Sequence, residues 1–212
     1  MEAIILTGGS GKRLLPLTKD IPKCMLKVNG KPLLDYHVKW LKQYGVEKIV
    51  LACRYKWENI KRHYGDMFIY SVEKEPLGTG GAVKHALKYI ENENFFLVNA
   101  DDITDVDLNK LKKMGSNTIV LSRFHSNFGI VETKGNKVIN FKQKPLLPYW
   151  AWCGVALLNK NIPLPDKGAI ETETFPKIDL KAFKHKGFWM TVNTAKDLEE
   201  LENVAKKINL FK

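Results

Sequence analysis

The chain has 212 residues, of which 44% are apolar and 27% charged, a balance typical of a soluble globular protein with one large domain or two small ones. No apolar run approaches the roughly 18 residues of a membrane span, and the start lacks the basic region of a signal peptide, so we expect a cytoplasmic protein without membrane contact. Three scattered cysteines exclude a disulfide framework and a zinc site, whereas the net charge of +11 favours an anionic partner.

In the first half of the chain, short apolar strands alternate with segments of helical periodicity. Strands are predicted at Ala3–Leu6, 47–53, 67–73, 95–102 and 118–123, and helices at 33–44, 57–65, 78–90 and Val106–Met114. This alternation is typical of a mostly parallel sheet covered by helices on both faces. Ligands of such sheets bind beyond the carboxyl ends of the strands, so three segments that follow strands are expected to face one crevice: Gly8–Gly11, Gly78–Gly81 and Asn99–Asp102.

After about residue 124 the pattern becomes richer in strands. Residues 128–145 alternate around Lys134-Gly135-Asn136, which predicts a hairpin, and further strands are predicted at 152–160 and 187–193. A short helix is predicted within 172–183. The last helix follows Thr194 as its N-cap and carries one apolar face made of Leu198, Leu201, Val204 and Ile208. We therefore expect one α/β domain with a β-rich lobe in its second half.

A glycine-rich loop with Gly8, Gly9 and Gly11 follows the first predicted strand. The backbone N–H groups of such a loop can bind phosphate oxygens, and the cations that follow add positive charge. The loop lacks the Gly-Lys-Ser/Thr of a P-loop. Leu14 stands where a dinucleotide fingerprint has its third glycine. The loop by itself thus indicates phosphate, with a plain tight turn as the alternative.

The loop is part of a longer string, GGSGKRLLPLT followed by PKCML, that resembles the signature of nucleotide-sugar pyrophosphorylases, the sugar-1-phosphate nucleotidylyltransferases. Later segments resemble further motifs of that family in the same order: EPLGTGGAV at 75–83, NADD at 99–102, FGIVE with FKQKP at 128–145 and GFWMTVNTAKDLEE at 187–200. The resemblance implies a Rossmann-like three-layer nucleotidyltransferase fold, with a mostly parallel mixed sheet and a small β-rich sugar-binding lobe. It looks closest to the mannose and heptose 1-phosphate guanylyltransferases.

The resemblance implies an activity and a division of the chain. A nucleoside monophosphate would pass from a nucleoside triphosphate to a sugar 1-phosphate, giving an NDP-sugar and pyrophosphate. GTP with a manno-configured sugar is preferred modestly over UTP, dTTP and CTP. Residues 1–212 would form a single catalytic domain, with a nucleotide half at about 1–124, a sugar-side half at about 125–212, and no C-terminal β-helix.

The resemblance also assigns roles to individual residues. Arg13 would hold the β- and γ-phosphates, Lys23 the α-phosphate under attack, and Asp101 would complete the catalytic set. The residues implied in nucleotide binding are Leu6, Gly8, Gly9, Gly11, Lys23, Glu75, Gly80 and Gly81. Those implied in sugar-phosphate binding are Gly129, Gln143, Lys144, Gly154 and Glu171.

Magnesium is the implied cofactor, because a reaction between two polyanions needs cations. Asp101 matches the family's first metal ligand. The second is less defined, because Thr191 stands where the family has an aspartate. We expect Asn193 to complete the metal site, with Thr191 and Asp197 as alternatives, and Asp197 better suited to capping the last helix. Gln143 replaces a family glutamate, which could shift the sugar preference.

The sequence is compatible with other functions. A related enzyme could act on a non-sugar phosphate such as phosphocholine or inositol phosphate. A non-catalytic nucleotide-sugar-binding subunit is a further alternative, although Arg13, Lys23 and Asp101 are all present. A nucleic-acid-binding protein would explain the charge but not the ordered motifs. The expected partners are therefore a nucleoside triphosphate and a sugar 1-phosphate, without nucleic acid, and an oligomer is compatible with the sequence.

Overall fold

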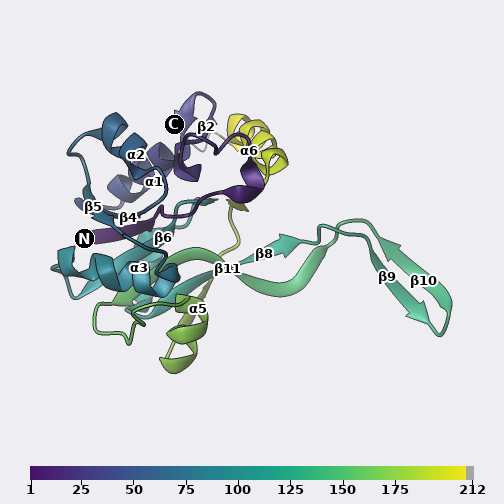
Figure 1. Cartoon of the computed structure of the whole chain (residues 1–212). Coiled ribbons are helices and arrows are strands. Elements are labelled where there is room, and N and C mark those ends of the chain that lie inside the picture. The colour runs from purple at the N-terminus through teal and green to yellow at the C-terminus, as the bar shows by residue number, and fades with distance from the viewer. Residues whose placement is uncertain (209–212) are drawn as a thin grey trace.

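The computed structural model describes the backbone of residues 1–208 and the side chains of residues 1–206. One central sheet of seven strands organises the molecule, in the order β12-β8-β11-β6-β1-β4-β5 (Figure 1). Its strands are β1 (Glu2–Leu6), β4 (Lys48–Cys53), β5 (Ile69–Val72), β6 (Asn94–Asn99), β8 (Thr118–His125), β11 (Leu146–Asn159) and β12 (Lys181–Lys184). β1 pairs in parallel with β4 and β6, whereas β11 runs antiparallel to both of its neighbours. The expected mostly parallel mixed sheet is confirmed.

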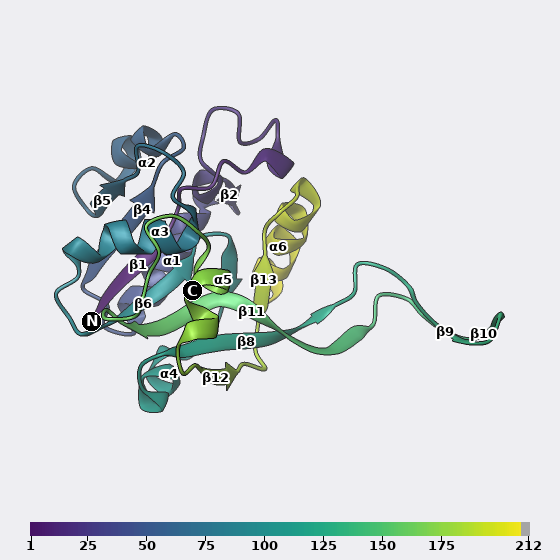
Figure 2. The same cartoon turned by 60° about the horizontal axis from the view of Figure 1, so that its bottom comes forward.

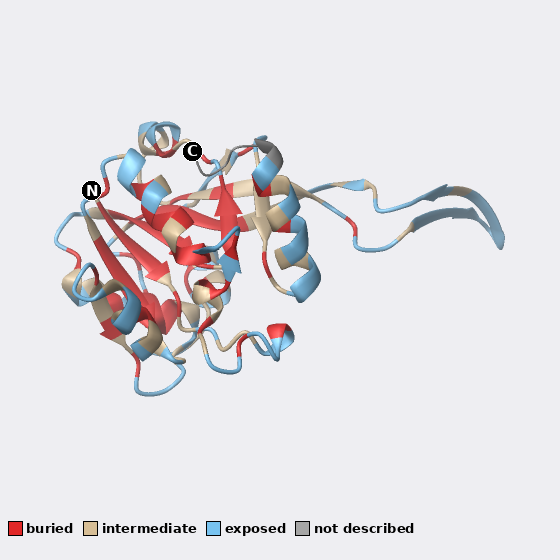
Figure 3. Cartoon of the chain, turned by 90° about the horizontal axis from the view of Figure 1, so that it is seen from above, coloured by how far each residue is buried: buried red, intermediate tan, exposed pale blue. Residues whose placement is uncertain are grey.

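Helices cover both faces of this sheet. The helices on the sheet are α1 (Leu33–Gln43), α2 (Trp57–Tyr64), α3 (Gly78–Ala86), α4 (Leu108–Met114) and α5 (Ile170–Glu173), whereas α6 (Ala195–Ile208) packs outside the sheet. Side chains of a strand point alternately to its two faces, so Ala3 and Ile5 of β1 pack in one core with α1, α2 and α4, while Ile4 packs in a second core with α3 and α5. The three layers follow from continuous apolar runs in the central strands, which are buried on both sides (Figure 3).

The smaller elements lie outside this sheet. Three two-stranded ribbons are formed by β2 (Lys27–Val28) with β3 (Lys31–Pro32), β7 (Asp102–Thr104) with β13 (Trp189–Thr191), and β9 (Ile130–Lys134) with β10 (Lys137–Lys142). Single 3-10 turns lie at Lys12–Leu14, Lys23–Met25, Leu87–Tyr89 and Phe175–Lys177. No helix in the described part of the chain combines the length and the apolar character that a membrane crossing needs.

Three predicted elements differ from the structure. The strand expected at 95–102 ends at Asn99, and Asp102 begins the separate strand β7, which pairs with β13. The helix expected within 172–183 is α5, which begins earlier, at Ile170, and the end of that segment is instead strand β12 at the edge of the central sheet. The strand expected at 152–160 is much longer, because β11 extends back to Leu146 and pairs with the whole of β8. The central sheet thus continues across the predicted division at about residue 124.

A third apolar cluster ties the end of the chain to its beginning. Leu201 and Ala205 of α6 pack with Leu14, Val28 and Tyr36 from the first forty residues. The side chain of Ile208, part of the predicted apolar face, lies outside the described residues. In addition, β13 pairs with β7, which places Thr191 opposite Asp102. These contacts bring the segment that follows β13 next to the glycine loop.

The hairpin β9-β10 forms as predicted but projects far from the body of the molecule, at the end of the long β8-β11 ladder (Figures 1 and 2). We call residues 128–145 the arm. All residues of β9 and most of β10 are exposed (Figure 3). The arm is therefore not packed against the rest of the chain as a closed lobe would be.

Candidate functional site

A cavity of about 360 Å³ opens beyond the carboxyl ends of the parallel strands. Its polar lining includes Gly8, Gly9, Arg54, Glu73, Thr79, Asn99 and Asp101. The three segments that were expected to face one crevice all contribute to it, in agreement with the rule for open α/β sheets. The volume lies within the usual range for small-molecule sites.

The glycine loop enters the cavity from the end of β1. Gly11 has φ +60°, and the 3-10 turn that follows buries Leu14 while leaving Arg13 exposed. The Thr18 hydroxyl donates a hydrogen bond of 2.8 Å to the carbonyl oxygen of Gly11. A side chain at position 11 would meet Thr18, so this turn requires glycine. The loop thus presents backbone and a guanidinium group on the same side.

Four predicted side chains from distant parts of the chain meet beside the cavity. The Lys23 ammonium donates to Asp101 Oδ2 at 2.7 Å and to Asn193 Oδ1 at 3.1 Å. Arg13 donates to the same Asn193 oxygen at 2.7 Å. Two cations thus face one carboxylate and one amide, which leaves excess positive charge for an anionic ligand. Arg13, Lys23, Asp101 and Asn193 therefore form a single cluster, which we call the charged cluster.

The last turn of the chain before α6 orients Asn193. Its side-chain nitrogen donates to Thr191 Oγ1 at 3.0 Å, so its oxygen is directed at Arg13 and Lys23. Asp197 accepts from the backbone N–H groups of Asn193 and Thr194, at 2.8 and 2.7 Å. Asp197 is thus committed to capping α6, and Thr191 to holding the amide.

The two adjacent aspartates at the end of β6 have different environments. Asp101 is partly exposed in the charged cluster, whereas Asp102 is buried and accepts from Asn99 and from the Trp189 indole. Burial, followed by repulsion from Asp101, raises the pKa of Asp102 to about 7. Asp102 therefore acts as an internal support, and Asp101 is the carboxylate available to a ligand.

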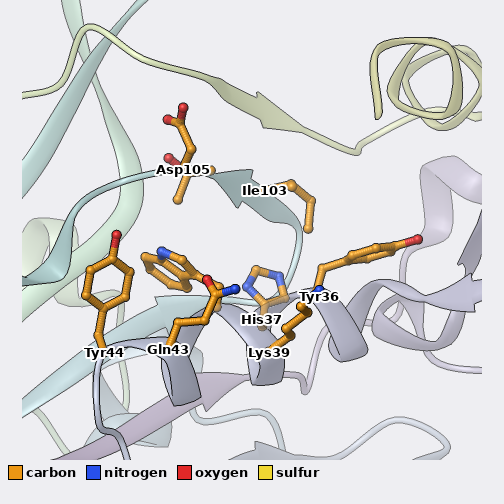
Figure 4. A pocket seen from close by; sticks show the side chains of 9 residues that line it. Tyr36, His37, Lys39, Gln43, Tyr44, Ile103 and Asp105 are labelled. Carbon is orange, nitrogen blue, oxygen red and sulfur yellow. The ribbon is translucent and has the colours of Figure 1, made fainter. Parts of the chain in front are cut away.

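A smaller cavity of about 130 Å³ lies between α1 and β7 (Figure 4). His37 lines it, and its Nε2 lies 3.1 Å from the carbonyl oxygen of Ala100. Burial lowers the pKa of His37 to about 4, so the ring is neutral at physiological pH and Nε2–H must donate to the carbonyl. His37 thereby braces the backbone directly before Asp101.

Close packing explains the glycines of the second loop. Added Cβ atoms on Gly80 and Gly81 would lie 2.8 Å from Pro165 and 2.5 Å from the Asp166 carbonyl oxygen. These two glycines therefore let α3 approach the segment 165–168. Nearby, the Thr79 hydroxyl donates to Glu171 at 2.7 Å, whereas Glu75 is exposed and pairs with Lys167. Leu6, at the end of β1, lines the cavity itself.

The residues predicted on the sugar side are separated in the structure. Gly154 lies in β11 next to Asn99 and Asp102. Gly129, Gln143 and Lys144 lie together on the arm, where the carbonyl oxygen of Lys144 is 2.9 Å from His125 Nδ1. The arm projects away from the body of the molecule (Figure 2), so these three residues are remote from the charged cluster of their own chain.

Sequence reasoning missed Arg54 and Glu73, which both line the cavity. Each directly follows a strand, β4 and β5 respectively, and the rule that ligands bind at the carboxyl ends of parallel strands would have found them. Glu73 Oε2 accepts from the Leu77 N–H at 3.2 Å. Burial raises the pKa of Glu73.

The three-layer α/β fold and a cationic cluster beside a glycine-lined cavity are typical of a protein that binds phosphorylated ligands at the carboxyl ends of its parallel strands. The chain belongs to the Nucleotidyl transferase family, which matches residues 2–202. The predicted family, fold and enzyme class are thereby confirmed, and the chain is a nucleotidyltransferase.

Curated relatives and solved structures agree with this assignment. The chain is 37% identical to D-glycero-alpha-D-manno-heptose 1-phosphate guanylyltransferase of Campylobacter jejuni, over 93% of this chain and 96% of the relative. It is 35% identical to mannose-1-phosphate guanyltransferase 2 of Candida glabrata, over 93% of this chain and 62% of the relative. The structure of HddC from Yersinia pseudotuberculosis complexed with GMP-PN superimposes with a TM-score of 0.75 at 28% identity, covering 96% and 98% of the two chains.

Gly154 offers a test of the packing behind the site. It has φ +73°, and an added Cβ would lie 2.1 Å from Asp102 Oδ2 and 2.9 Å from Asn99 Cβ. Gly154→Ala should therefore destabilise the fold by about 2 kcal/mol or more, measured by urea denaturation. Gly135→Ala is the matched control, because Gly135 also has positive φ (+56°) but no atom near its Cβ position. Equal losses in both variants would contradict the close-packing role of Gly154.

Proposed function

We propose that this chain transfers GMP from GTP to the 1-phosphate of a manno-configured sugar, releasing pyrophosphate and forming a GDP-sugar. The named relatives support the base and the sugar class, since they are guanylyltransferases acting on heptose and mannose phosphates. The observation that carries the proposal is the charged cluster of Arg13, Lys23, Asp101 and Asn193 beside the glycine-lined cavity. The three cysteines are free and buried, which fits a reaction in the reducing cytoplasm.

The charged cluster suits an in-line displacement at the α-phosphorus. A sugar-phosphate oxygen forms the new bond to phosphorus as the bond to the bridging oxygen of pyrophosphate breaks, so negative charge moves to the leaving group. Arg13 can hold that leaving group through two N–H donors, and Lys23 is the adjacent point charge for the α-phosphate. Because both substrates are polyanions, positioning and charge neutralisation supply the catalysis, and no side chain is needed as nucleophile.

The donor atoms of the cluster fit a magnesium ion. Asp101 Oδ2 and Asn193 Oδ1 already converge on one cation, the Lys23 ammonium, and carboxylate and amide oxygens are hard ligands of the kind magnesium takes. Among the described residues no group of three or more His, Cys, Asp or Glu could hold a metal. Magnesium shared with substrate phosphates needs only one or two protein ligands. The ion would neutralise phosphate charge, with Lys23 released to the α-phosphate.

Glu73 is the residue that supports guanine as the base. Its carboxylate lines the cavity, with one oxygen held by the Leu77 N–H. Guanine presents two donors side by side, N1–H and the 2-amino group, and a carboxylate accepts both, whereas adenine, cytosine and uracil lack this pair. Leu6, Gly8 and Gly9 line the same cavity, so we assign the nucleotide to it. Glu75, Gly11, Gly80 and Gly81 would support it from the flanking loops, and Gly154 and Glu171 would meet the sugar.

Glu73→Gln tests the choice of base. The amide keeps the size of the side chain but replaces one acceptor by a donor that opposes the guanine donors. In a panel of GTP, UTP, dTTP and CTP with mannose and manno-heptose 1-phosphates, followed by pyrophosphate release, the wild type should prefer GTP. The variant should lose about tenfold or more in kcat/KM for GTP. Glu58→Gln, on the exposed surface of α2, is the control. An unchanged GTP preference in Glu73→Gln would refute this role of Glu73.

Asp101→Ala tests the catalytic assignment. Removing the partly exposed carboxylate should abolish detectable pyrophosphate release, because the cation site loses its only charged ligand, while the thermal unfolding profile stays close to that of the wild type. Far-ultraviolet circular dichroism and a melting curve check the fold. Turnover at the wild-type rate in a folded variant would rule out Asp101 as a metal ligand.

Asn193→Ala separately tests the second ligand. We expect the magnesium concentration for half-maximal rate to rise by about tenfold, because the ion loses one of its two protein oxygens. Thr191→Val is the comparison, since it removes the hydroxyl that orients the amide and should produce a smaller shift in the same direction. A magnesium titration of Asn193→Ala that superimposes on the wild-type curve would overturn the assignment.

A further inference from the structure

One face of the arm is mainly polar, with Ile130 opposite Lys142 as an apolar exception, and the other face is mainly apolar. In the register of the hairpin, Glu132 lies opposite Asn140, and its carboxylate binds the Asn140 amide and the Lys142 ammonium on the same face. On the other face, Val131 lies opposite Phe141. Antiparallel ribbons with this alternation normally cover their apolar face, because two strands alone are at best marginally stable in water.

Exposed apolar side chains are concentrated on this part of the molecule. Among the described residues, eleven large hydrophobic side chains are exposed, and eight of them lie within residues 128–149. They are Phe128, Ile130, Val131, Val138, Ile139, Phe141, Leu146 and Tyr149. Such a concentration of exposed apolar side chains on one segment indicates an interaction surface rather than ordinary surface composition.

The described part of the body, up to residue 206, does not cover these side chains. The arm extends away from it in both views (Figures 1 and 2). In the register of the two long strands, Leu146 pairs with His125, and Gly154 lies between the residues that pair with Leu121 and Ile119. The two positions are therefore separated by about five residues of β8, or about 16 Å at ~3.3 Å per residue. A lysine side chain spans only a fraction of that length. Lys144 and Gln143 therefore lie out of reach of the cavity in their own chain.

We propose that the arm docks on a second copy of this chain and brings Lys144 and Gln143 to the nucleotide cavity of that copy. This inference rests on the proposed function, which needs a cationic group for the incoming sugar phosphate. A second copy is the partner that fits, because it carries the same cavity and charged cluster, which the arm cannot reach in its own chain. Two reciprocal exchanges form a closed twofold dimer in which each site is built from both chains.

Surfaces on the body match the arm in charge and polarity. Leu15 and Leu17, exposed in the same loop as Arg13, offer an apolar counterpart beside the cavity. The arm carries the cations Lys134, Lys137, Lys142 and Lys144 against the single acid Glu132. The start of α6, in a chain of net charge +11, carries four acids, Asp197, Glu199, Glu200 and Glu202, against the single cation Lys196. This local acidity favours an approach of the basic arm to the side of the cavity where Asn193 precedes α6.

Complementation between two inactive chains tests the shared site. Asp101→Ala and Lys144→Ala are co-expressed with different affinity tags, and the doubly tagged species is purified in two steps. If the arm acts in the partner, one site of each heterodimer combines both substitutions and the other is intact. Turnover per heterodimer should then reach about half of the wild-type value, while each homodimer shows little or none. If the arm acts within its own chain, both sites carry one substitution and no activity returns, which would overturn the proposal.

The mass of the protein in solution gives a readout independent of catalysis. Light scattering after gel filtration should give a dimer for the wild type and a monomer for Phe141→Asp, which places a charge in the apolar face of the arm. Met67→Asp is the matched control, because Met67 is similarly exposed but lies on the body, and it should remain dimeric. A monomeric, active wild type would refute the arm exchange. A dimer that Phe141→Asp dissociates, without nucleotidyl transfer by the wild type, would instead refute the proposed function alone.

Discussion

The Lys23 ammonium lies between the Asp101 carboxylate and the Asn193 amide oxygen, and the geometry of the whole site depends on this junction. Its three residues come from a 3-10 turn near the start of the chain, from the end of β6 and from the turn before α6. The Lys23 side chain is only 14% exposed, and both oxygens accept hydrogen bonds from its ammonium group. A ligand that replaces Lys23 as the partner of these two oxygens must also supply a negative group to the lysine. A phosphate with a bound cation does both.

Support for this junction comes from groups that never contact a ligand. Neutral His37 braces the backbone before Asp101, buried Asp102 is bound by Asn99 and Trp189, and Thr191 turns the Asn193 amide toward the cations. These contacts hold the reacting region in place before substrate binds, which lowers the reorganisation needed during the reaction. Glycines also support the site where two elements approach too closely for a side chain, as at Gly154 beside Asp102.

The arm represents the opposite situation. The charged cluster satisfies its polar groups within one chain, whereas the apolar face of the arm, with Val131 and Phe141, is not covered by any described residue of that chain. Burial of such side chains is worth roughly 1.5–3 kcal/mol each, so an uncovered patch of this size favours association. In the proposed dimer, the contact that buries the patch would also place Lys144 at the cavity of the partner chain. Lys144 cannot reach the cavity of its own chain.

Much of this protein could be predicted from the sequence. Buried runs such as 49–53 and 95–98 specify parallel strands because only a sheet covered on both faces accommodates them, and the ordered motifs that contain Arg13, Lys23 and Asp101 identify the family. The start of α5 was misplaced, and β12 was not predicted, because the β12 residues form a strand through pairing with β8 rather than through local preference. Tertiary structure alone decided that Asn193 meets Lys23, that Arg54 and Glu73 line the cavity, and that the arm stands apart. Periodicity and motifs are local properties of the chain, whereas contacts across 170 positions depend on how the layers pack.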